Sequence, residues 1–270
     1  MPPLDDRIGL RFDTVAERYH LMRPRYPDVV WDALFEITAL PPCARVLEIG
    51  AGTGIATADL VRRGCHVTAL EPGAAMAAII ERDLGDTGQV DVRTDRFEDF
   101  VWDGEPFDLA IGATSLHWVG RDLLNTRLLA LVRPGAHAAL LHYVHVAGGD
   151  TAFFEAAQQC YARWDPYYRE PDYPEHHLRS PDDAGHRATV LDDLPGFDPA
   201  KHRYWLVDIP SDREHYLSLI STYSTTLRLP DENRQGLFAC IGDLMDREFG
   251  GQITKRYRFD LVVRRRCDTA

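Results

Sequence analysis

The chain has 270 residues, of which 45% are hydrophobic and 27% are charged, enough for one large domain or for a domain with a sizeable added segment. Its 42 acidic residues outnumber its 30 basic residues and give a net charge of −12, which disfavours nucleic acid or an anionic membrane surface as a partner. No run approaches the roughly 18 apolar residues of a membrane-spanning helix. We therefore expect a protein that binds a small-molecule substrate, without nucleic acid or membrane, as a monomer or homodimer.

Residues 1–40 are predicted to form an N-terminal helical cap segment, with short helices at 14–20 and 28–38. Residues 41–150 then alternate apolar runs with helical spacing, and we expect them to form the ligand-binding core. The strands are expected at 45–50, 66–71, 89–93, 107–113 and 136–146, and the helices at 55–63, 74–84 and 123–132. Because the links are short, this order predicts an α/β fold with a doubly wound, Rossmann-like, mostly parallel sheet.

Residues 151–250 interrupt the strand–helix alternation and are expected to form a substrate-binding cap insertion with one or more returning elements. The helices are expected at 153–164, 213–221 and 230–249, with a polar, proline-containing loop at 165–193. Residues 251–270 contain an alternating strand pattern. We expect this last segment to rejoin the sheet, which makes 151–250 a helical cap inserted before the last strands. The aromatic residues of this insertion are equally consistent with a pocket and with ordinary packing.

Cysteine and histidine spacing predicts neither a disulfide framework nor a metal site. The five cysteines, at positions 43, 65, 160, 240 and 267, form no Cys-x-x-Cys pair, which suits reduced thiols. The pair His176-His177 belongs to no His-Glu-x-x-His or similar motif. The residues Met1–Arg7 lack a basic segment followed by an apolar one, so we expect no signal peptide and a cytoplasmic location.

The sharpest motif is a glycine-rich turn, Glu48-Ile-Gly-Ala-Gly-Thr-Gly54, between the first strand and the first helix of the core. Glycines allow a tight turn and a close approach of ligand to backbone, and the start of the helix offers free N–H groups. Glu71 ends the next strand, where a carboxylate can accept hydrogen bonds from both hydroxyls of a ribose. The pairing predicts a nucleoside-containing cofactor, unless the glycines only form a turn and Glu71 is a surface acid.

Two cofactor classes use this pairing, NAD and S-adenosylmethionine. The dinucleotide fingerprint requires glycine or alanine at its sixth position, which here is Ile55. A negative charge at Glu48 would be unfavourable beside a pyrophosphate, but it is acceptable near the ammonium group of a methionine. No Gly-Lys-Ser/Thr follows the turn, which excludes a phosphate-binding loop. S-adenosylmethionine is therefore favoured, with an NAD-dependent oxidoreductase and a non-catalytic cofactor-binding protein as alternatives.

The sequence resembles the class I S-adenosylmethionine-dependent methyltransferases. The resemblance rests on residues 46–54, on Glu71, and on the segments 107–118 and 131–135, in the order and spacing of that family. It implies a seven-stranded sheet, S-adenosyl-L-methionine as the cofactor and methyl transfer as the reaction. Within the family, Arg23-Pro-Arg-Tyr-Pro27 and Ser115-Leu-His-Trp118 resemble the small-molecule branch that includes trans-aconitate methyltransferase. The expected acceptor is a small molecule methylated at O, N or C, such as a carboxylate or an aromatic secondary metabolite.

The resemblance also implies which residues bind the cofactor. The turn residues Gly50, Ala51 and Gly52 would contact its amino-acid and ribose parts. Glu71 would bind the ribose, and Pro72 would lie near the adenine. The other residues expected near the methionine end are Glu48, Ala113, Thr114 and Trp118.

One part of the expected cofactor site departs from the family pattern. Where family members often place an acid against the adenine amino group, this chain has Arg96. The adjacent Phe97 is therefore the favoured adenine contact, and Asp95 is the alternative.

Methyl transfer from a sulfonium needs little side-chain chemistry, because the donor is already activated and the protein mainly aligns the reactants and excludes water. Tyr19, Tyr26 and Trp118 are candidates to stabilise the sulfonium charge through their rings, and Arg23 is a candidate to bind a carboxylate of the cofactor or of an acidic substrate. If the acceptor loses a proton, the candidate bases are His117, His142 and Tyr223. Each of these residues is also compatible with a purely structural role.

Overall fold

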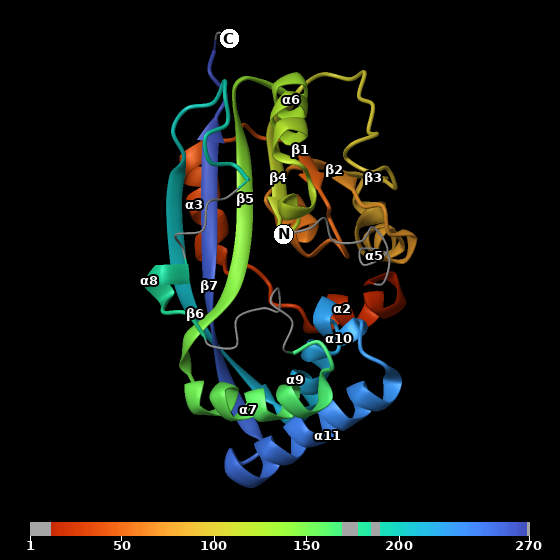
Figure 1. The fold of residues 1–270 in the computed structure, drawn as a ribbon. Coiled ribbons are helices and arrows are strands. Elements are labelled where there is room, and N and C mark those ends of the chain that lie inside the picture. The colour runs from red at the N-terminus through yellow and green to blue at the C-terminus, as the bar shows by residue number, and fades with distance from the viewer. Residues whose placement is uncertain (1–11, 169–177, 185–189, 269–270) are drawn as a thin grey trace. The chain divides into compact units, whose positions relative to one another are not determined.

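Figure 1 shows a computed structural model that describes residues 12–168, 178–184 and 190–268. The first eleven residues of the expected N-terminal segment and the pair His176-His177 lie outside the described residues. The strands are β1 (Arg45–Ile49), β2 (His66–Leu70), β3 (Val90–Arg93), β4 (Phe107–Ala113), β5 (Val132–Gly149), β6 (Lys201–Asp212) and β7 (Gln252–Arg265). They form one sheet in the order β3-β2-β1-β4-β5-β7-β6.

Each expected helix is present with ends within two residues of the prediction. The α-helices are α2 (Ala16–Met22), α3 (Asp28–Thr38), α4 (Ile55–Arg62), α5 (Ala74–Leu84), α6 (Arg121–Leu131), α7 (Thr151–Trp164), α8 (Pro181–Ala184), α9 (Arg213–Ile220), α10 (Ser224–Leu227) and α11 (Asp231–Glu248). Of these, α8, inside the expected loop 165–193, and α10 were not expected. The 3-10 helices are η1 (Phe12–Val15), η2 (Gly85–Thr87) and η3 (Leu116–Trp118). Within the described ranges, no helix combines the length and apolar character needed to cross a membrane.

The chain divides into two compact units. The core unit consists of Pro24–Tyr143, Arg187–Trp205 and Phe259–Ala270, and the helical unit consists of Met1–Arg23, Val144–His186 and Leu206–Arg258. The strands β5, β6 and β7 each have residues in both units. The functional division expected at residues 40, 150 and 250 is a separate question and stays a prediction.

The core unit contains the parallel part of the sheet. β1 pairs in parallel with β2 and with β4, β2 pairs with β3, and β4 pairs with β5. β1 is buried from Val46 to Ile49, as expected for a parallel strand covered on both faces. Figure 1 shows α6 in front of the sheet and α3 behind it. The expected α/β fold with a mostly parallel, seven-stranded sheet is confirmed.

The strand order places a topological switch point between β1 and β4. From β1 the chain moves outward through β2 and β3, and it then returns to the other side of β1 with β4 and β5. In open α/β sheets, ligands bind in the crevice outside the carboxyl ends of the strands at such a point. The glycine-rich turn leaves the carboxyl end of β1, so the fold places it where a ligand is expected.

β7 runs antiparallel to β5. The Arg266 N–H bonds to the carbonyl of Ala136, and the Asp150 N–H bonds to the carbonyl of Thr254, so residue numbers rise along one strand while they fall along the other. The expected return of the C-terminal strand is confirmed.

β6, by contrast, has no counterpart among the strands expected from sequence. It is an edge strand in which the partly buried Trp205, Val207 and Ile209 and the buried Ser211 form one row facing the protein. Pro210 and the exposed Leu206 obscure that period in the sequence.

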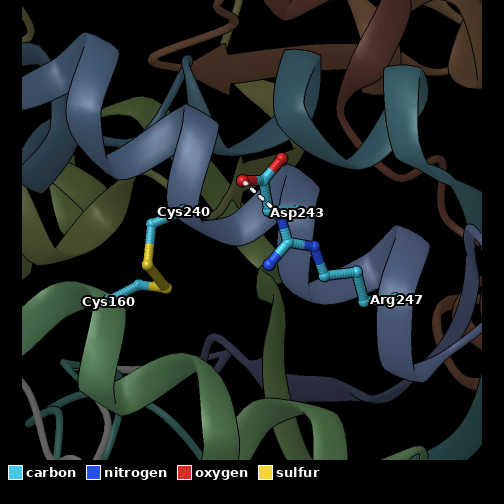
Figure 2. Close-up of a disulfide and its surroundings, with 4 residues drawn as sticks. All are labelled: Cys160, Cys240, Asp243 and Arg247. Carbon is cyan, nitrogen blue, oxygen red and sulfur yellow. Dashed lines mark ion pairs between the residues drawn. A yellow bond between two sulfur atoms is a disulfide. The ribbon is translucent and has the colours of Figure 1, made fainter.

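The helical unit has its own apolar core, in which α7 and α11 lie side by side (Figure 1). Phe153 of α7 and Leu237 and Ile241 of α11 are fully buried there. Cys160 and Cys240 form a disulfide that joins the two helices (Figure 2). This corrects the expectation of reduced thiols for these two cysteines. Their pairing depends on helix packing rather than on sequence spacing, which gave no signal. Cys43, Cys65 and Cys267 are free thiols.

We expect the disulfide to stabilise the helical unit. The bridge spans 80 residues of sequence, and closing a loop of that length removes about 4 kcal/mol of chain entropy from the unfolded state. A thiol reductant should lower the thermal midpoint by roughly 5–15 °C, and the double variant Cys160→Ala/Cys240→Ala should melt at the same temperature with and without reductant. The control Cys43→Ser should keep the wild-type response. Equal midpoints for the oxidised and reduced wild type would contradict the prediction.

Candidate functional site

The glycine-rich turn adopts a backbone that suits glycine at three positions. Gly50, Gly52 and Gly54 have φ of +68°, +60° and +80°, in the left-handed region where a Cβ is disfavoured. A Cβ at Gly50 would lie 2.7 Å from the Cβ of Ser115, so glycine also permits the close approach of the segment after β4. At Gly52, no atom lies within 4 Å of the place that a Cβ would take. The backbone at Gly52 is therefore open to a ligand.

Glu71 is joined to the turn by direct hydrogen bonds. The Gly52 N–H donates to Oε2 over 2.8 Å, and the Gly73 N–H donates to Oε1 over 2.7 Å. The Ala51 N–H also bonds to the carbonyl of Leu70, the last residue of β2. Glu71 is only 8% exposed, so these charge-assisted bonds are partly shielded from water. The structure thus brings together the turn and the acid that the sequence paired.

Glu48 is a buried carboxyl group at the start of the turn. The Thr57 hydroxyl donates to its Oε2 over 2.7 Å, while its buried Oε1 has no hydrogen-bond partner within the described residues. Burial raises the pKa of Glu48 to about 8; the Thr57 bond opposes the rise, and the charge of Glu71 adds to it. Glu48 is therefore largely protonated at neutral pH, and a cation placed near Oε1 would favour its ionised form.

The end of β4 is held to the end of β1 by Ser115, which sequence reasoning did not single out. The Ser115 hydroxyl donates to the Ile49 carbonyl, and the Tyr26 hydroxyl lies 2.6 Å from the Thr114 hydroxyl. Thr114 has φ of +57°, an uncommon value for a non-glycine residue and one that is frequent at functional sites. Ser115 and Tyr26 stand within the motifs that carried the family resemblance, but only the folded chain shows their partners.

Two candidate bases lie in the core unit near this strand end. His117 is exposed beside the ring of Trp118, with 5.0 Å between the ring centroids. The protein atoms around the imidazole lower the pKa of His117 to about 4, and His142 contributes to the shift. A neutral imidazole at physiological pH can accept a proton. Trp118 is 41% exposed, and its role in covering the cofactor stays a prediction.

The expected adenine contacts divide into exposed and buried residues. Pro72, Asp95 and Arg96 are exposed, and Arg96 pairs with Glu98 over 3.7 Å. Phe97 is 4% exposed and packs in the apolar core of this unit. Its ring offers little surface to a ligand in this conformation, so the adenine contact of Phe97 stays a prediction.

Three further candidates gather in the helical unit. The Arg23 guanidinium donates to the hydroxyl and the carbonyl of Thr222, over 3.0 and 2.8 Å. It also lies over the rings of Tyr19 and Tyr223, 4.6 and 4.9 Å from their centroids. Sequence reasoning missed Lys255, which donates to the Tyr223 hydroxyl. Its only sequence signal is that Lys201 and Lys255 are the two lysines of the chain.

Within the ranges that the structure describes, no group of three or more metal-ligating side chains is found.

A family model described as "Methyltransferase domain" matches residues 46–135. This segment holds the glycine turn, Glu71 and the end of β4. Residues 46–135 are therefore similar in sequence to methyltransferase domains. The match confirms the methyltransferase part of the resemblance, while the trans-aconitate branch stays a prediction.

Relatives of the methyltransferase domain are found among curated proteins. An uncharacterized methyltransferase of Mycobacterium tuberculosis (strain ATCC 25618 / H37Rv) is 31% identical over 135 residues, which cover 50% of this chain and 52% of that protein. A malonyl-acyl carrier protein O-methyltransferase of Magnetococcus marinus is 30% identical over 188 residues, which cover 63% and 62%. The chain therefore spans about half the length of the mycobacterial relative.

Solved structures share the fold of most of this chain. A protein from Anaeromyxobacter dehalogenans, proposed to be a type II methyltransferase, superposes with a TM-score of 0.61 at 22% identity, over 91% of this chain and 98% of that one. A proposed methyltransferase from an antibiotic biosynthesis pathway of Anabaena variabilis gives a TM-score of 0.57 at 16% identity, over 87% and 98%. At these identities the likeness concerns the fold alone.

The close approach at Gly50 gives a first test of the methyltransferase-domain turn. Gly50→Ala should destabilise the fold by about 2–4 kcal/mol, because strain at positive φ adds to the clash with Ser115. Gly88 has the same φ of +68°, but no atom lies within 4 Å of the place that its Cβ would take, so Gly88→Ala should cost only about 1–2 kcal/mol. Urea unfolding of both variants measures the difference. Equal losses would mean that Ser115 moves aside without cost.

Burial of Glu48 predicts a pH dependence of stability. Because the folded state raises the pKa of Glu48 from 4.5 to about 8, it holds a proton that the unfolded chain releases between these values. The contribution of Glu48 to stability therefore falls as pH rises through that window. Glu48→Gln has no proton to lose and can keep the Thr57 bond, so its stability relative to wild type should rise by up to roughly 4 kcal/mol across the window.

Urea unfolding at several pH values checks this prediction. The matched control is Glu36→Gln, because Arg203 lowers the pKa of the exposed Glu36, and its effect on stability should be flat over the same window. A constant difference between Glu48→Gln and wild type would show that Glu48 is ionised in the folded state.

Proposed function

We propose that this chain is an S-adenosyl-L-methionine-dependent methyltransferase that acts on a small-molecule acceptor. The observation that carries the proposal is the hydrogen bond from the Gly52 N–H to Glu71. This bond places an acid that could bind the hydroxyls of a ribose beside an open glycine turn. The methyltransferase domain matched over residues 46–135 supports it. The alternatives are an NAD-dependent oxidoreductase and a non-catalytic cofactor-binding protein, and both are outcomes of the tests below.

The residues of the turn fit this cofactor. The open space at Gly52 leaves room for a ligand against the backbone. Glu71 presents both carboxylate oxygens beside the turn, where each accepts an N–H, and two carboxylate oxygens match the two hydroxyls of a ribose. The buried Oε1 of Glu48 has no hydrogen-bond partner within the described residues, and the ammonium group of a methionine would supply one.

The proposed mechanism asks the chain mainly to bind and align. When bound, S-adenosylmethionine supplies a methyl group that its sulfonium already activates. Gly50, Ala51 and Gly52 would hold the amino-acid end and Glu71 the ribose, so that the methyl group is presented in a fixed direction. His117 would accept the proton of an acceptor that carries one, because its imidazole is neutral at pH 7. A carboxylate acceptor would need no base.

The acceptor is proposed to be a small molecule methylated at oxygen, nitrogen or carbon. The likeness of the segments 23–27 and 115–118 to the trans-aconitate methyltransferase branch supports a carboxylate or an aromatic secondary metabolite. The relative from Magnetococcus marinus is named for O-methylation of malonyl-acyl carrier protein, which also favours an acidic acceptor. We also propose that the protein is a monomer or a homodimer.

Glu71→Gln tests the cofactor assignment. The amide presents one acceptor oxygen in place of two, so affinity for S-adenosylmethionine and S-adenosylhomocysteine should fall roughly 10- to 100-fold. Isothermal titration calorimetry measures both ligands and NAD, with Glu36→Gln as the control at an exposed position. Thermal melting of each variant shows that the fold persists. Binding of NAD without binding of S-adenosylhomocysteine would refute the proposal.

Mass spectrometry can identify the product. The protein is incubated with a metabolite extract and cofactor that carries an isotopically labelled methyl group, and the labelled product names both acceptor and acceptor atom. Tight cofactor binding with no labelled product and no S-adenosylhomocysteine formed above blank would favour the non-catalytic alternative.

A further inference from the structure

Lys255 is a buried cation in the helical unit. It lies on β7 with only 5% of its surface exposed. Its Nζ donates to the Tyr223 hydroxyl over 2.8 Å, and it lies 5.1 and 5.0 Å from the ring centroids of Tyr223 and Tyr257. Among the residues that the structure describes, no carboxylate forms an ion pair with it. An ammonium group in this position is costly to bury, and aromatic faces offset only part of the cost.

A second cation, Arg23, lies near Lys255. Arg23 also lies over the ring of Tyr223, 4.9 Å from its centroid. Burial would raise the pKa of Tyr223, but Lys255 and Arg23 together lower it below its ordinary value. Burial, and then the charge of Lys255, lower the pKa of His145 to about 2, so that imidazole adds no charge. The Nε2 of His145 has no hydrogen-bond partner within the described residues.

The hydrogen-bonding capacity of this cluster is incompletely used. An ammonium group has three N–H donors, and the described residues supply Lys255 with one hydrogen-bonded partner, the Tyr223 oxygen. Because that oxygen accepts from Lys255, the Tyr223 O–H can donate to a further acceptor, and the Tyr257 side chain also lies within hydrogen-bonding reach of Tyr223. The residues Tyr223 and His145 are half-buried. An anion would supply both the missing negative charge and the missing acceptors.

We infer that Lys255 and Tyr223 form an anion-recognition site for the methyl acceptor, which therefore carries a carboxylate or phosphate group. The inference rests on the proposed function, because it assigns the substrate class of a methyltransferase. Lys255 supplies the charge, and Tyr223 relays a hydrogen bond from Lys255 to the anion. Both are binding residues, and neither needs to take part in bond breaking.

Binding of simple anions tests the site directly. Wild-type protein should bind acetate, succinate and benzoate, or else inorganic phosphate, at millimolar concentrations in calorimetric titrations at constant ionic strength. The two arms tell a carboxylate site from a phosphate site, and ethylammonium should not bind. Lys255→Met should weaken the preferred anion by at least about tenfold. Lys201→Met, at the other lysine of the chain, which is exposed, should change binding less than about twofold.

A second readout separates this inference from the proposed function. Lys255→Met should leave the affinity for S-adenosylhomocysteine unchanged, whereas Glu71→Gln should weaken it and leave anion binding intact. Equal weakening of both ligands by Lys255→Met would mean that the anion is the carboxylate of the cofactor, and would overturn the inference. If the wild type bound anions but no S-adenosylhomocysteine, the proposed function would fail while the anion site stood.

Two further variants guard against effects on folding and on charge. Lys255→Met should melt at or above the wild-type temperature, because it removes a buried charge, and Lys255→Arg should retain most of the anion binding. Tyr223→Phe should weaken anion binding several-fold through loss of the relayed hydrogen bond. Stronger anion binding by Tyr223→Phe would show that an ionised Tyr223 is the counter-ion of Lys255, and would refute the site. Failure of every anion to bind the wild type would refute it as well.

Discussion

The arrangement of the candidate site depends on the hydrogen bond between the Gly52 N–H and the Glu71 carboxylate. Two adjacent parallel strands end at the same edge of a sheet, and here Ile49 of β1 lies level with Leu70 of β2. The residues that follow each strand are therefore forced together, and the Ala51 N–H closes the gap by bonding to Leu70. Glu71, which follows β2, can therefore accept a hydrogen bond from the turn. The register of two strands thus positions both binding groups at once.

Much of the core could be predicted because its signals are local. The buried run of β1, the glycines after it and the acid after β2 lie close together in sequence, and parallel pairing follows from the short links. β6 was missed because an edge strand buries one weak row of side chains, and Pro210 interrupts its pattern. The Cys160–Cys240 bridge was missed because its two cysteines are 80 residues apart and meet only when α7 packs on α11.

The electrostatic state of the site could not be predicted from residue types. Sequence reasoning treated Glu48 as a negative charge, but burial raises its pKa to about 8, so the folded chain holds it largely neutral. The pKa of Glu48 is raised because burial disfavours the charged carboxylate and, among the described residues, only Oε2 accepts a hydrogen bond, from Thr57. A cation that reached Oε1 would favour the ionised form, so Glu48 would release its proton to solvent and binding of that cation would depend on pH.

Methyl transfer itself constrains few side chains, because the donor is activated before it binds. The motifs of such a protein therefore report on donor binding, and in this chain the segments 46–54, 107–118 and 131–135 and the acid Glu71 lie in the core unit. Recognition of the acceptor requires only complementary shape and charge, which many sequences can supply, so no motif marks it. Lys255 shows how such a determinant can still be found. In a chain with net charge −12, a lysine buried with a phenol as its hydrogen-bond partner has a physical cost that packing alone does not explain, and the proposed anionic acceptor would account for it.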